Sequence, residues 1–238
     1  MPKVDLSIII PCYNEGPTFE SSVKKIIEVA KNLEKTWEII FVEDKSVDDT
    51  KITVEKITKK YRNIYAIFHK KNEGRGKCVA EGIKKAIGEI CGYLDVDLEV
   101  SANYIPIFIE SIREGNDMAV ATRFYESGGL KSLNRFFASR GYSQIVRLVL
   151  NLPLSDTEAG YKFFNRKRIL PVLSKVKNKH WFWDTEICAQ AHYNGLKIVE
   201  IPVIFKRRLD KKSTVKVIPD SIHFALSILK FKLNRIFK

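Results

Sequence analysis

Asp95 and Asp97 are the pair of residues in this 238-residue chain whose spacing is best suited to chemistry. They follow the apolar run Ile90–Leu94, which is typical of a buried strand. Because side chains alternate across a strand, both carboxylates are expected to point the same way while Val96 points into the protein. Two such groups repel each other unless a cation lies between them. Mg²⁺ or Mn²⁺ suits this position, since hard cations prefer oxygen ligands and bridge carboxylates to phosphates. The alternative is a polar turn after a strand, where Asp is common.

Apolar runs and helix-start signals alternate along the chain. This alternation predicts an α/β fold with a mostly parallel central sheet flanked by helices, as in Rossmann-like proteins. No linker-like stretch or internal repeat is present, so we expect one compact domain over residues 1–218 and a C-terminal helical appendage over residues 219–238. The predicted strands are Leu6–Ile10, Trp37–Val42, Ile64–Phe68, Ile90–Leu94, Asp117–Ala121 and Ile198–Phe205, and the predicted helices span residues 17–33, 48–61, 77–88 and 101–113, a segment ending near Tyr193, and 220–237.

Polar and charged residues follow nearly every predicted strand. In open parallel sheets, ligands bind at the carboxyl ends of the strands. Carboxylates, the backbone amides of a glycine loop and an arginine on one edge are the groups that a nucleotide diphosphate and its metal ion require. The loop residues Arg75 and Lys77 beside Gly74 and Gly76 favour a phosphate near a helix N-terminus, although the glycines could serve only a tight turn. The residues at these strand ends are Tyr13, Glu15, Glu43, Asp44, the loop 72–77, Asp95, Asp97 and Arg123.

Composition narrows the class of protein further. The formal net charge of +13 indicates an anionic partner, which could be nucleic acid, nucleotide phosphate or an acidic membrane surface. The four cysteines form no C-x-x-C pair, which argues against a zinc site and for a reduced, cytosolic setting. The four histidines lack metal-ligand spacing. We find no signal peptide and no span of about 20 uncharged apolar residues, so we expect no transmembrane helix.

Several short motifs occur in a fixed order from Val4 to about Ser221. Together they resemble the inverting glycosyltransferases of family 2, which have the GT-A fold, and within them the polyprenyl-phosphate sugar synthases such as dolichol-phosphate mannose synthase and dolichyl-phosphate glucosyltransferase. The motifs in the last two segments are the more specific for the lipid-phosphate branch. The motifs are Ile10-Pro11-Cys12-Tyr13-Asn14-Glu15, Val42-Glu43-Asp44-Lys45-Ser46, Asn72-Glu73-Gly74-Arg75-Gly76-Lys77, Asp95-Val96-Asp97, Ala121-Thr122-Arg123, residues 155–162 and residues 182–186.

The resemblance implies roles for individual residues. The metal ligands would be Asp95, Asp97 and Glu99, with Asp97 favoured over Asp95 for direct coordination and Glu99 as a further ligand, and the catalytic residues would be Asp95, Asp97, Arg123 and Asp156. The metal ion would be Mg²⁺ or Mn²⁺. Asp44 would bind the base, Arg123 the diphosphate, and Asp156 the acceptor side. The residues implied in nucleotide-sugar binding are Pro11, Tyr13, Glu15, Asp44, Gly76, Lys77, Asp95, Arg123, Arg208 and Ser213.

Some positions depart from the family pattern or have an ordinary structural explanation. Glu43 and Lys45 replace the more usual Asp and Gly, which leaves uracil and guanine both open as the base. Thr214 stands where a Lys is usual after Ser213. Tyr13 could be a packing residue, and Arg123 could be a solvated loop arginine.

The resemblance implies transfer of a sugar, with inversion, from a UDP- or GDP-sugar to a polyprenyl phosphate at the cytoplasmic membrane face. A lipid phosphate is already a nucleophilic anion, so this reaction needs no dedicated general base. The first alternative is transfer to a soluble or polysaccharide hydroxyl, which would need a base among Asp156, Asp184 and Glu186. A non-catalytic nucleotide-sugar binding module is a second alternative. A nucleic-acid binder is the third, but the chain has no recognised nucleic-acid motif.

Two apolar segments bear on the membrane. Leu133–Leu154 is rich in apolar and aromatic residues, with arginines interspersed. The last predicted helix carries one apolar stripe with Leu226, Leu229 and Leu233, and a second apolar side with Phe224, Ile228 and Phe231 among lysines. A helix that lies in the bilayer interface would explain both sides. The alternatives are a terminal core helix with its lysines directed to solvent, or a dimer contact.

Overall fold

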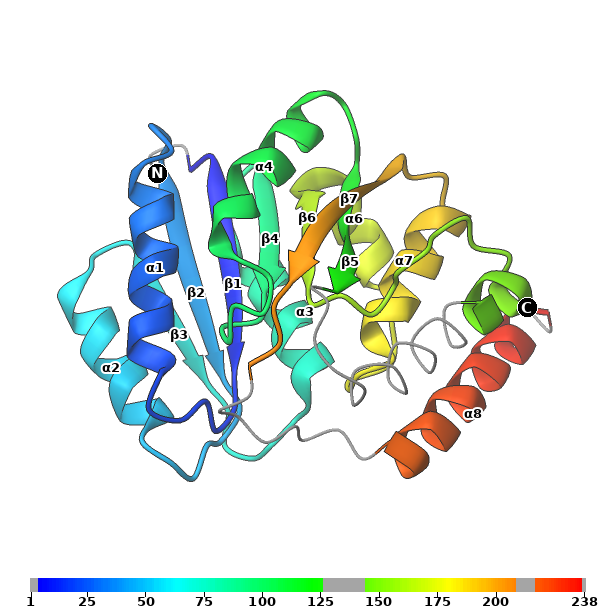
Figure 1. Cartoon of the computed structure of the whole chain (residues 1–238), viewed down its shortest axis with the longest axis horizontal. Coiled ribbons are helices and arrows are strands. Elements are labelled where there is room, and N and C mark those ends of the chain that lie inside the picture. The colour runs from blue at the N-terminus through cyan, green and yellow to red at the C-terminus, as the bar shows by residue number, and fades with distance from the viewer. Residues whose placement is uncertain (1–3, 126–143, 209–216, 237–238) are drawn as a thin grey trace.

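The computed structural model of this chain describes residues 4–125, 144–208 and 217–236 (Figure 1). Apolar runs form its strands, and amphipathic segments form the helices between them. The strands are β1 (Leu6–Cys12), β2 (Trp37–Glu43), β3 (Ile64–Phe68), β4 (Ile90–Leu94), β5 (Met118–Tyr125), β6 (Tyr161–Asn165) and β7 (Ile198–Phe205). The helices are α1 (Phe19–Lys31), α2 (Thr50–Lys60), α3 (Arg75–Lys85), α4 (Ile105–Arg113), α6 (Arg166–Leu173), α7 (Trp183–Tyr193) and α8 (Val217–Ile236), with a 3₁₀ turn at Ala102–Tyr104 and a further helical segment at residues 144–150.

The strands form a seven-stranded sheet in the order β3-β2-β1-β4-β6-β5-β7. β1 runs parallel to β2 and β4, β2 parallel to β3, and β5 parallel to β7. Only β6, inserted between β4 and β5, is antiparallel to its neighbours. The carboxyl ends of β1, β2, β3 and β4 therefore lie at one edge of the sheet, the lower edge in Figure 1. The predicted α/β fold with a mostly parallel sheet is confirmed, although β6 and α6 were not predicted.

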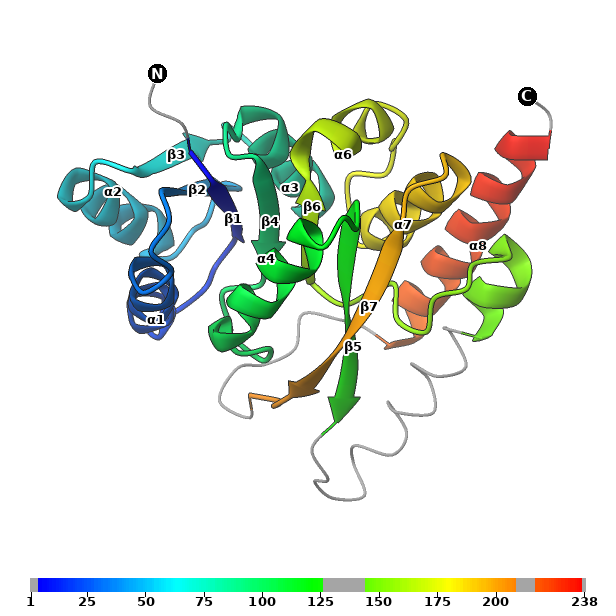
Figure 2. The same ribbon diagram turned by 90° about the horizontal axis from the view of Figure 1, so that it is seen from above.

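Helices cover both faces of the sheet (Figure 2). On one face, residues of α1, α2 and α4 pack against one side of the strands in a single buried cluster. On the other face, residues of α3, α6 and α7 pack against the opposite side of the same strands. Alternation within β1 shows the division, since Ile8 and Ile10 belong to the first cluster and Ile9 to the second. The result is a three-layer α/β/α domain.

Residues after β7 fold back toward the end of β4. Val100 pairs with Phe205 in an isolated antiparallel bridge, and the backbone N–H of Lys206 donates to the carbonyl of Glu99 at 2.8 Å. This pairing joins two segments that are far apart in the sequence. It brings the start of the basic segment after β7 to the turn that contains Asp97 and Glu99.

The last helix packs on the domain through a third apolar cluster. Ile228 of α8 is buried there with Val146 and Leu150 of the segment 144–150 and with Phe182 and Ala189. Among the residues that the structure describes, no helix combines the length and apolar character needed to cross a bilayer.

Candidate functional site at the carboxyl edge of the sheet

Asp95 lies directly after β4 and is held from two sides. Its backbone N–H donates to the carbonyl of Gly160 at 3.0 Å. Its Oδ1 accepts two bonds from the guanidinium of Arg75, from Nε at 3.0 Å and from Nη2 at 2.6 Å. A side chain at position 160 could not be accommodated, because a Cβ there would lie 1.8 Å from Asp95 Oδ2. The carboxylate is therefore fixed in place by a charge-assisted pair and by a close backbone approach.

Arg75 is anchored in turn by a buried charge network. Its Nη1 donates to Asp184 Oδ2 at 2.5 Å, and its guanidinium lies 5.4 Å from the ring centroids of both Tyr93 and Trp181. Asp184 Oδ1 accepts from Lys162 Nζ at 2.9 Å and from the Tyr93 hydroxyl. Burial alone would raise the pKa of Asp184, but Arg75 and Lys162 outweigh that effect and hold the pKa below its ordinary value. Asp184 is thus an ionised buried anchor.

The turn after Asp95 carries the other two predicted metal ligands. Leu98 adopts a left-handed conformation with φ of 56°, and Asp97 Oδ1 accepts the N–H of Glu99 at 3.2 Å. Glu99 Oε1 accepts the N–H of Arg208 at 3.0 Å, so Glu99 also ties the segment after β7 to this turn. All three carboxylates lie within one short stretch after the end of β4, and their role as metal ligands remains a prediction.

Removal of solvent raises the pKa of Asp95, and the charges of Asp97 and Asp184 act in the same direction while Arg75 opposes them. A divalent cation at this position would relieve that repulsion. The oxygen-only set of Asp95, Asp97 and Glu99 also fits the ligand preference of Mg²⁺ and Mn²⁺. The chemistry of these ligands suits the predicted metal ion, but among the described residues the oxygens of these three side chains do not all come within 4.8 Å of one another.

Arg123 and Asp156, from two different predicted motifs, form one bidentate ion pair. Arg123 Nε and Nη2 donate to the two carboxylate oxygens of Asp156 at 2.7 and 3.0 Å. Asp156 also accepts backbone N–H groups of Arg123, Glu158 and Ala159. Burial would raise the pKa of Asp156, but Arg123 outweighs it and keeps the pKa low. The pair holds the Arg123 guanidinium in a fixed orientation beside the carboxyl edge of the sheet.

Glu158 lies beside this pair, and its pKa is shifted in the direction opposite to that of Asp156. Its Oε2 is 3.9 Å from Arg123 Nη2, and its side chain remains 26% exposed. Burial raises the pKa of Glu158 to about 7, with the charge of Asp156 adding to the shift and Arg123 opposing it. Glu158 can therefore exchange a proton near neutral pH, which Asp156 cannot.

Asp44 lies buried after β2, where it organises the glycine loop. It accepts backbone N–H groups from Glu73 at 2.7 Å and from Gly74 at 2.9 Å. Gly74 has φ of 98°, a conformation that favours glycine. Asp44 also pairs with His69 Nδ1 at 2.6 Å. These bonds use both carboxylate oxygens. The contact of Asp44 with the base remains a prediction.

The loops after β1 and β2 are interlocked. Pro11 is buried near the end of β1, and Tyr13 beyond it is 45% exposed. The N–H of Tyr13 donates to Glu15 Oε1 at 3.1 Å, and the N–H of Glu15 donates to Thr50 Oγ1 at 2.9 Å. Tyr13 thus offers an exposed ring at the sheet edge beside the Asp44 loop, a position compatible with the nucleoside role predicted for Tyr13 and Glu15.

Gly76 and Lys77 begin α3, and packing explains much of their environment. A Cβ on Gly76 would lie 2.4 Å from the Cβ of Trp183, so glycine is required for contact between α3 and α7. The N–H of Lys77 donates to the carbonyl of Lys179 at 3.0 Å, and its Nζ pairs with Glu81 at 2.7 Å. Contact of either residue with nucleotide remains a prediction, as does that of Arg208. Ser213 lies outside the described residues.

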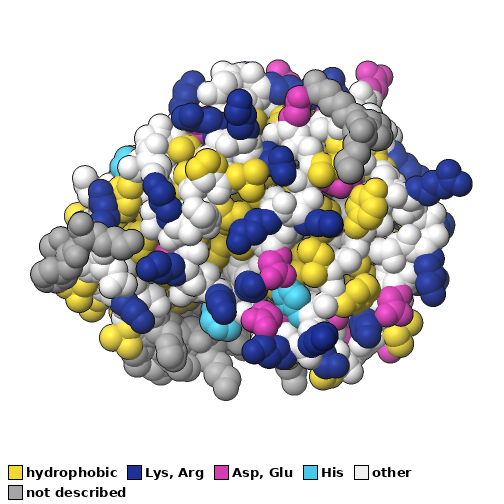
Figure 3. Space-filling view, turned by 180° about the vertical axis from the view of Figure 1, so that it is seen from behind, with side chains coloured by type: hydrophobic (Ala, Val, Ile, Leu, Met, Phe, Trp, Pro, Cys, Tyr) yellow, Lys and Arg dark blue, Asp and Glu magenta, His cyan; other side chains and the backbone are white. Residues whose placement is uncertain are grey.

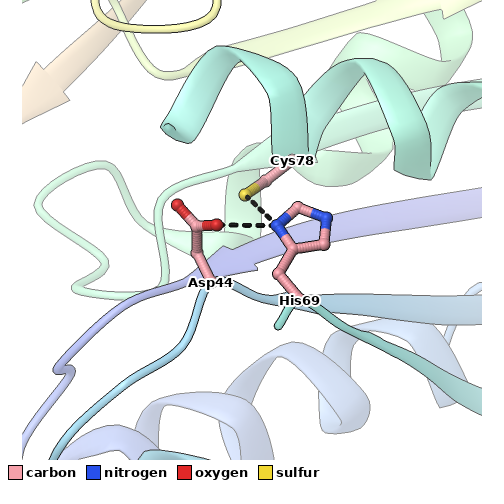
Figure 4. A group of neighbouring side chains, drawn as sticks. All are labelled: Asp44, His69 and Cys78. Atoms are coloured by element: carbon pink, nitrogen blue, oxygen red, sulfur yellow. Dashed lines mark hydrogen bonds and ion pairs between the residues drawn. The ribbon is translucent and has the colours of Figure 1, made fainter. Parts of the chain in front are cut away.

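The histidine at the end of β3 joins two carboxylates. His69 Nδ1 faces Asp44, and Nε2 lies 2.7 Å from Glu81 Oε2. Asp44, His69 and Cys78, whose Sγ is 3.9 Å from Nδ1, form the group in Figure 4, and their ligand atoms lie within 4.8 Å of one another. Burial raises the pKa of the Cys78 thiol, with Asp44 adding to the shift, so the sulfur stays protonated. The hydrogen bonds of His69 account for this cluster without a metal ion.

The three residues predicted as possible general bases are all engaged inside the protein. Asp156 is paired with Arg123, and Asp184 is paired with Arg75 and Lys162. Glu186 is buried and accepts the backbone N–H groups of Lys177 and Asn178 at 3.0 and 2.7 Å. Basic side chains are spread over the face shown in Figure 3, in keeping with the net charge of +13.

Solved structures identify the class of fold. The chain superposes on glucosyl-3-phosphoglycerate synthase from Mycobacterium tuberculosis, solved with Mn²⁺, uridine diphosphate and glucosyl-3-phosphoglycerate, with a TM-score of 0.69 and 15% identity, covering 98% of this chain and 80% of that one. The same synthase with Mn²⁺, uridine diphosphate and phosphoglyceric acid gives a TM-score of 0.72 at 15% identity, covering 98% and 78% of the two chains. This likeness establishes the GT-A fold that the motifs predicted.

The chain belongs to glycosyl transferase family 2, whose family model matches residues 7–170. It is 28% identical over 95% of its length to glycosyltransferase AglD of Haloferax volcanii and 27% identical over 94% to a dolichyl-phosphate beta-glucosyltransferase of Trichomonas vaginalis. It is also 28% identical over 89% to a dolichol-phosphate mannosyltransferase of Pyrococcus furiosus. The chain spans 37%, 74% and 59% of these three relatives, respectively.

Proposed function

We propose that this protein transfers a sugar, with inversion, from a nucleotide-diphospho-sugar of the UDP-glucose or GDP-mannose class to a polyprenyl phosphate. The observation that carries the proposal is the arrangement at the carboxyl edge of the sheet, where Asp95 and Asp97 lie at the end of β4 and the Arg123–Asp156 pair lies at the end of β5. The relatives named for dolichyl-phosphate and dolichol-phosphate transfer support this acceptor class.

Asp95, Asp97 and Glu99 would hold a Mg²⁺ or Mn²⁺ ion at the end of β4. When bound, such an ion acts as a Lewis acid that stabilises negative charge on a departing diphosphate. Arg75 holds Asp95 through two hydrogen bonds, so the carboxylate needs no reorganisation when the donor arrives. Asp184 holds Arg75 in the same way from the interior.

Arg123 contributes a fixed guanidinium. Asp156 uses both oxygens to orient the guanidinium, and Arg123 also lies 5.7 Å from the ring centroid of Phe205. A guanidinium oriented before the substrate binds stabilises charge that grows on the leaving diphosphate in the transition state. In this proposal Asp156 positions Arg123 and does not remove a proton.

The three carboxylates predicted as possible general bases are bound to partners inside the protein, which favours a phosphate acceptor. Asp156, Asp184 and Glu186 are each committed to internal partners, so none is available to deprotonate an acceptor hydroxyl. A polyprenyl phosphate supplies an anionic oxygen that attacks the anomeric carbon without losing a proton. Such an acceptor lies in a membrane, and we propose that the protein acts as a peripheral protein at the cytoplasmic face.

Glu158 gives one specific reason to keep a second candidate function. Its pKa of about 7 and its position near Arg123 suit a general base. A family 2 enzyme that acts on a soluble or polysaccharide hydroxyl would need such a group. Under this alternative, Glu158 would deprotonate the acceptor hydroxyl.

A transfer assay distinguishes the two acceptors. Labelled UDP-glucose or GDP-mannose is incubated with Mg²⁺ or Mn²⁺ and either a short polyprenyl phosphate or a saccharide mixture, and the organic and aqueous phases are counted. The proposal predicts label in the organic phase, and it predicts that Glu158→Gln retains most of that transfer. Label that appears only in saccharide, and that Glu158→Gln abolishes, would establish the hydroxyl acceptor instead.

A further inference from the structure

The helix α8 has two apolar sides that face in opposite directions. Its inner side packs on the domain: Ile228 is 2% exposed, and the rings of Phe224 and Phe231 lie 6.5 and 6.1 Å from that of Phe182. Arg235 extends the same side, with its guanidinium 3.3 Å from the ring centroid of Tyr193. These contacts fix which side of the helix faces inward.

The outer side of α8 is also apolar, and its large side chains are about half exposed. Leu226, Leu229 and Leu233 are 58%, 53% and 52% exposed. At about 100° per residue, they cluster roughly opposite Phe224, Ile228 and Phe231 on the helix. Core packing therefore does not account for these three leucines.

The neighbouring helical segment 144–150 also exposes large apolar residues. This segment lies beside α8 in both ribbon views (Figures 1 and 2), and its Val146 and Leu150 share a buried cluster with Ile228. Its outward residues include Leu148, which is 83% exposed, and Ile145, which is 52% exposed. Large exposed aliphatic side chains on two neighbouring helices are typical of an interaction surface.

Basic residues flank the leucines. Lys230 lies about 40° around the helix from Leu226, and Lys232 lies about 60° from Leu229 on the opposite flank. Both lysines are exposed. The outer side of α8 therefore presents a central apolar stripe with a positive charge on either edge.

This pattern decides between two occupants of the surface. In a symmetric contact between two copies of the chain, the same patch lies on both sides, which tends to bring like-charged flanks together. An anionic bilayer accepts leucines at the boundary of its acyl chains and pairs lysines with headgroup phosphates. The net charge of +13 on the whole chain also favours an anionic partner such as this bilayer.

We propose that the outward leucine face, formed by Leu148, Leu226, Leu229 and Leu233, binds the surface of an anionic lipid bilayer, with Lys230 and Lys232 contacting headgroup phosphates. The inference rests on the proposed function only in choosing a lipid surface, since a lipid acceptor must be reached at a membrane. The residues that carry it belong to α8 and the segment 144–150 and take no part in the proposed chemistry at the sheet edge.

Co-sedimentation with vesicles tests this proposal without donor, acceptor or metal. Vesicles of phosphatidylcholine alone are compared with vesicles that also contain phosphatidylglycerol. We expect the chain to bind the anionic vesicles, and Leu226→Gln/Leu229→Gln/Leu233→Gln to lower the partition coefficient about 100-fold. Lys230→Gln/Lys232→Gln should lower it about 30-fold on anionic vesicles and little on neutral ones.

A matched control separates this face from general surface hydrophobicity. Ile52, Ile87 and Ile107 are 65%, 47% and 53% exposed and lie outside α8 and the segment 144–150. The variant Ile52→Gln/Ile87→Gln/Ile107→Gln should bind vesicles as the parent chain does. Circular dichroism and the thermal midpoint establish that each variant folds.

Three outcomes would overturn the proposal: no binding of the parent chain to anionic vesicles, equal losses in the leucine and isoleucine variants, or a change from dimer to monomer in the leucine variant with unchanged vesicle binding. The last would identify a second copy as the occupant. A chain that binds vesicles but transfers no sugar would leave this proposal intact and contradict only the proposed function.

Discussion

Gly160→Ala tests how closely the site is built around Asp95. A Cβ at position 160 would lie 1.8 Å from Asp95 Oδ2, 2.5 Å from its Cγ and 2.6 Å from Arg75 Nη2. Ordinary contact distances are about 3.5 Å, so either the carboxylate or the Gly160 backbone must move by roughly 1.7 Å. The Asp95 side chain is short, and Arg75 fixes its other oxygen. The methyl group therefore displaces the carboxylate or breaks its pair with Arg75.

A misplacement of this size should lower kcat/KM for transfer about 100-fold, or about 2.7 kcal/mol of transition-state stabilisation. Overpacking should also lower the free energy of unfolding by about 1–3 kcal/mol. The assay measures initial rates of transfer from labelled donor, at saturating Mn²⁺, on protein that circular dichroism shows to be folded. The concentration of Mn²⁺ for half-maximal rate should rise in the variant, because Asp95 is a proposed ligand.

Gly195→Ala is the matched control for this prediction. Gly195 has φ of 72° and open space at the Cβ position, so alanine there introduces backbone strain without a collision. Its stability should fall while its transfer rate stays at the parent value. A Gly160→Ala variant that transfers within threefold of the parent rate would refute the argument that Gly160 keeps Asp95 in place.

Three further predictions concern the charged groups behind and beside the site. Asp184→Asn should lower the free energy of unfolding by about 3 kcal/mol, because Lys162 would be left buried without its anionic partner. Because folding lowers the pKa of Asp184, the ionised carboxylate stabilises the fold above the ordinary pKa of 3.8, and this stabilisation is lost as pH falls through the folded pKa. In urea unfolding, the free energy of unfolding of the variant should therefore fall less steeply at acidic pH than that of the parent chain. Burial lowers the pKa of His69, but its two carboxylate partners raise it more. His69→Gln should therefore lower the free energy of unfolding below about pH 6.5, and the loss should shrink as pH rises through the folded pKa of His69. An equal loss at all pH values would contradict this. Arg123→Ala should lower kcat more than it lowers donor affinity, and a change in donor affinity alone would remove Arg123 from the transition state.

Local patterns in the sequence are sufficient to predict much of the sheet. β3, β4 and β7 have the predicted bounds, because each is a short apolar run that ends at polar residues or a turn. The positions of Asp95 and Asp97 at the end of β4 follow from the same pattern. Since parallel strands share a carboxyl edge, the grouping of these carboxylates with Asp44 and Arg123 could be predicted as well.

β6 could not be predicted in the same way. Its sequence, Tyr161–Asn165, contains a lysine that is completely buried in the structure. Lys162 is tolerated there because Asp184 and the carbonyl of Ala159 satisfy its charge. Asp184 approaches Lys162 only when β6 packs beside α7, so the local pattern contains no sign of this partner.

The anchoring of Asp95 could not be predicted either, because it also depends on residues that are distant in the sequence. From the sequence, Asp184 could equally cap the start of α7 or reach the site, and Arg75 indicated only phosphate near a helix N-terminus. In the structure Arg75 binds both Asp95 and Asp184, and it is separated from Asp184 by 109 positions in the sequence. The two apolar sides of α8 were visible in the sequence, but only the packing of Ile228 establishes which side faces outward.

Metal-dependent transfer by the parent chain and by Asp97→Ala tests the central claim most directly. Labelled UDP-glucose and GDP-mannose are each supplied with Mn²⁺ or Mg²⁺ and a short polyprenyl phosphate, and label in the organic phase is counted. The account predicts label there from one of the donors, lost on addition of EDTA and lost in Asp97→Ala, while the variant keeps the parent circular dichroism because no core cavity opens at a strand end. Parent-level transfer by a folded Asp97→Ala variant would contradict the proposed role of the carboxylates at the end of β4.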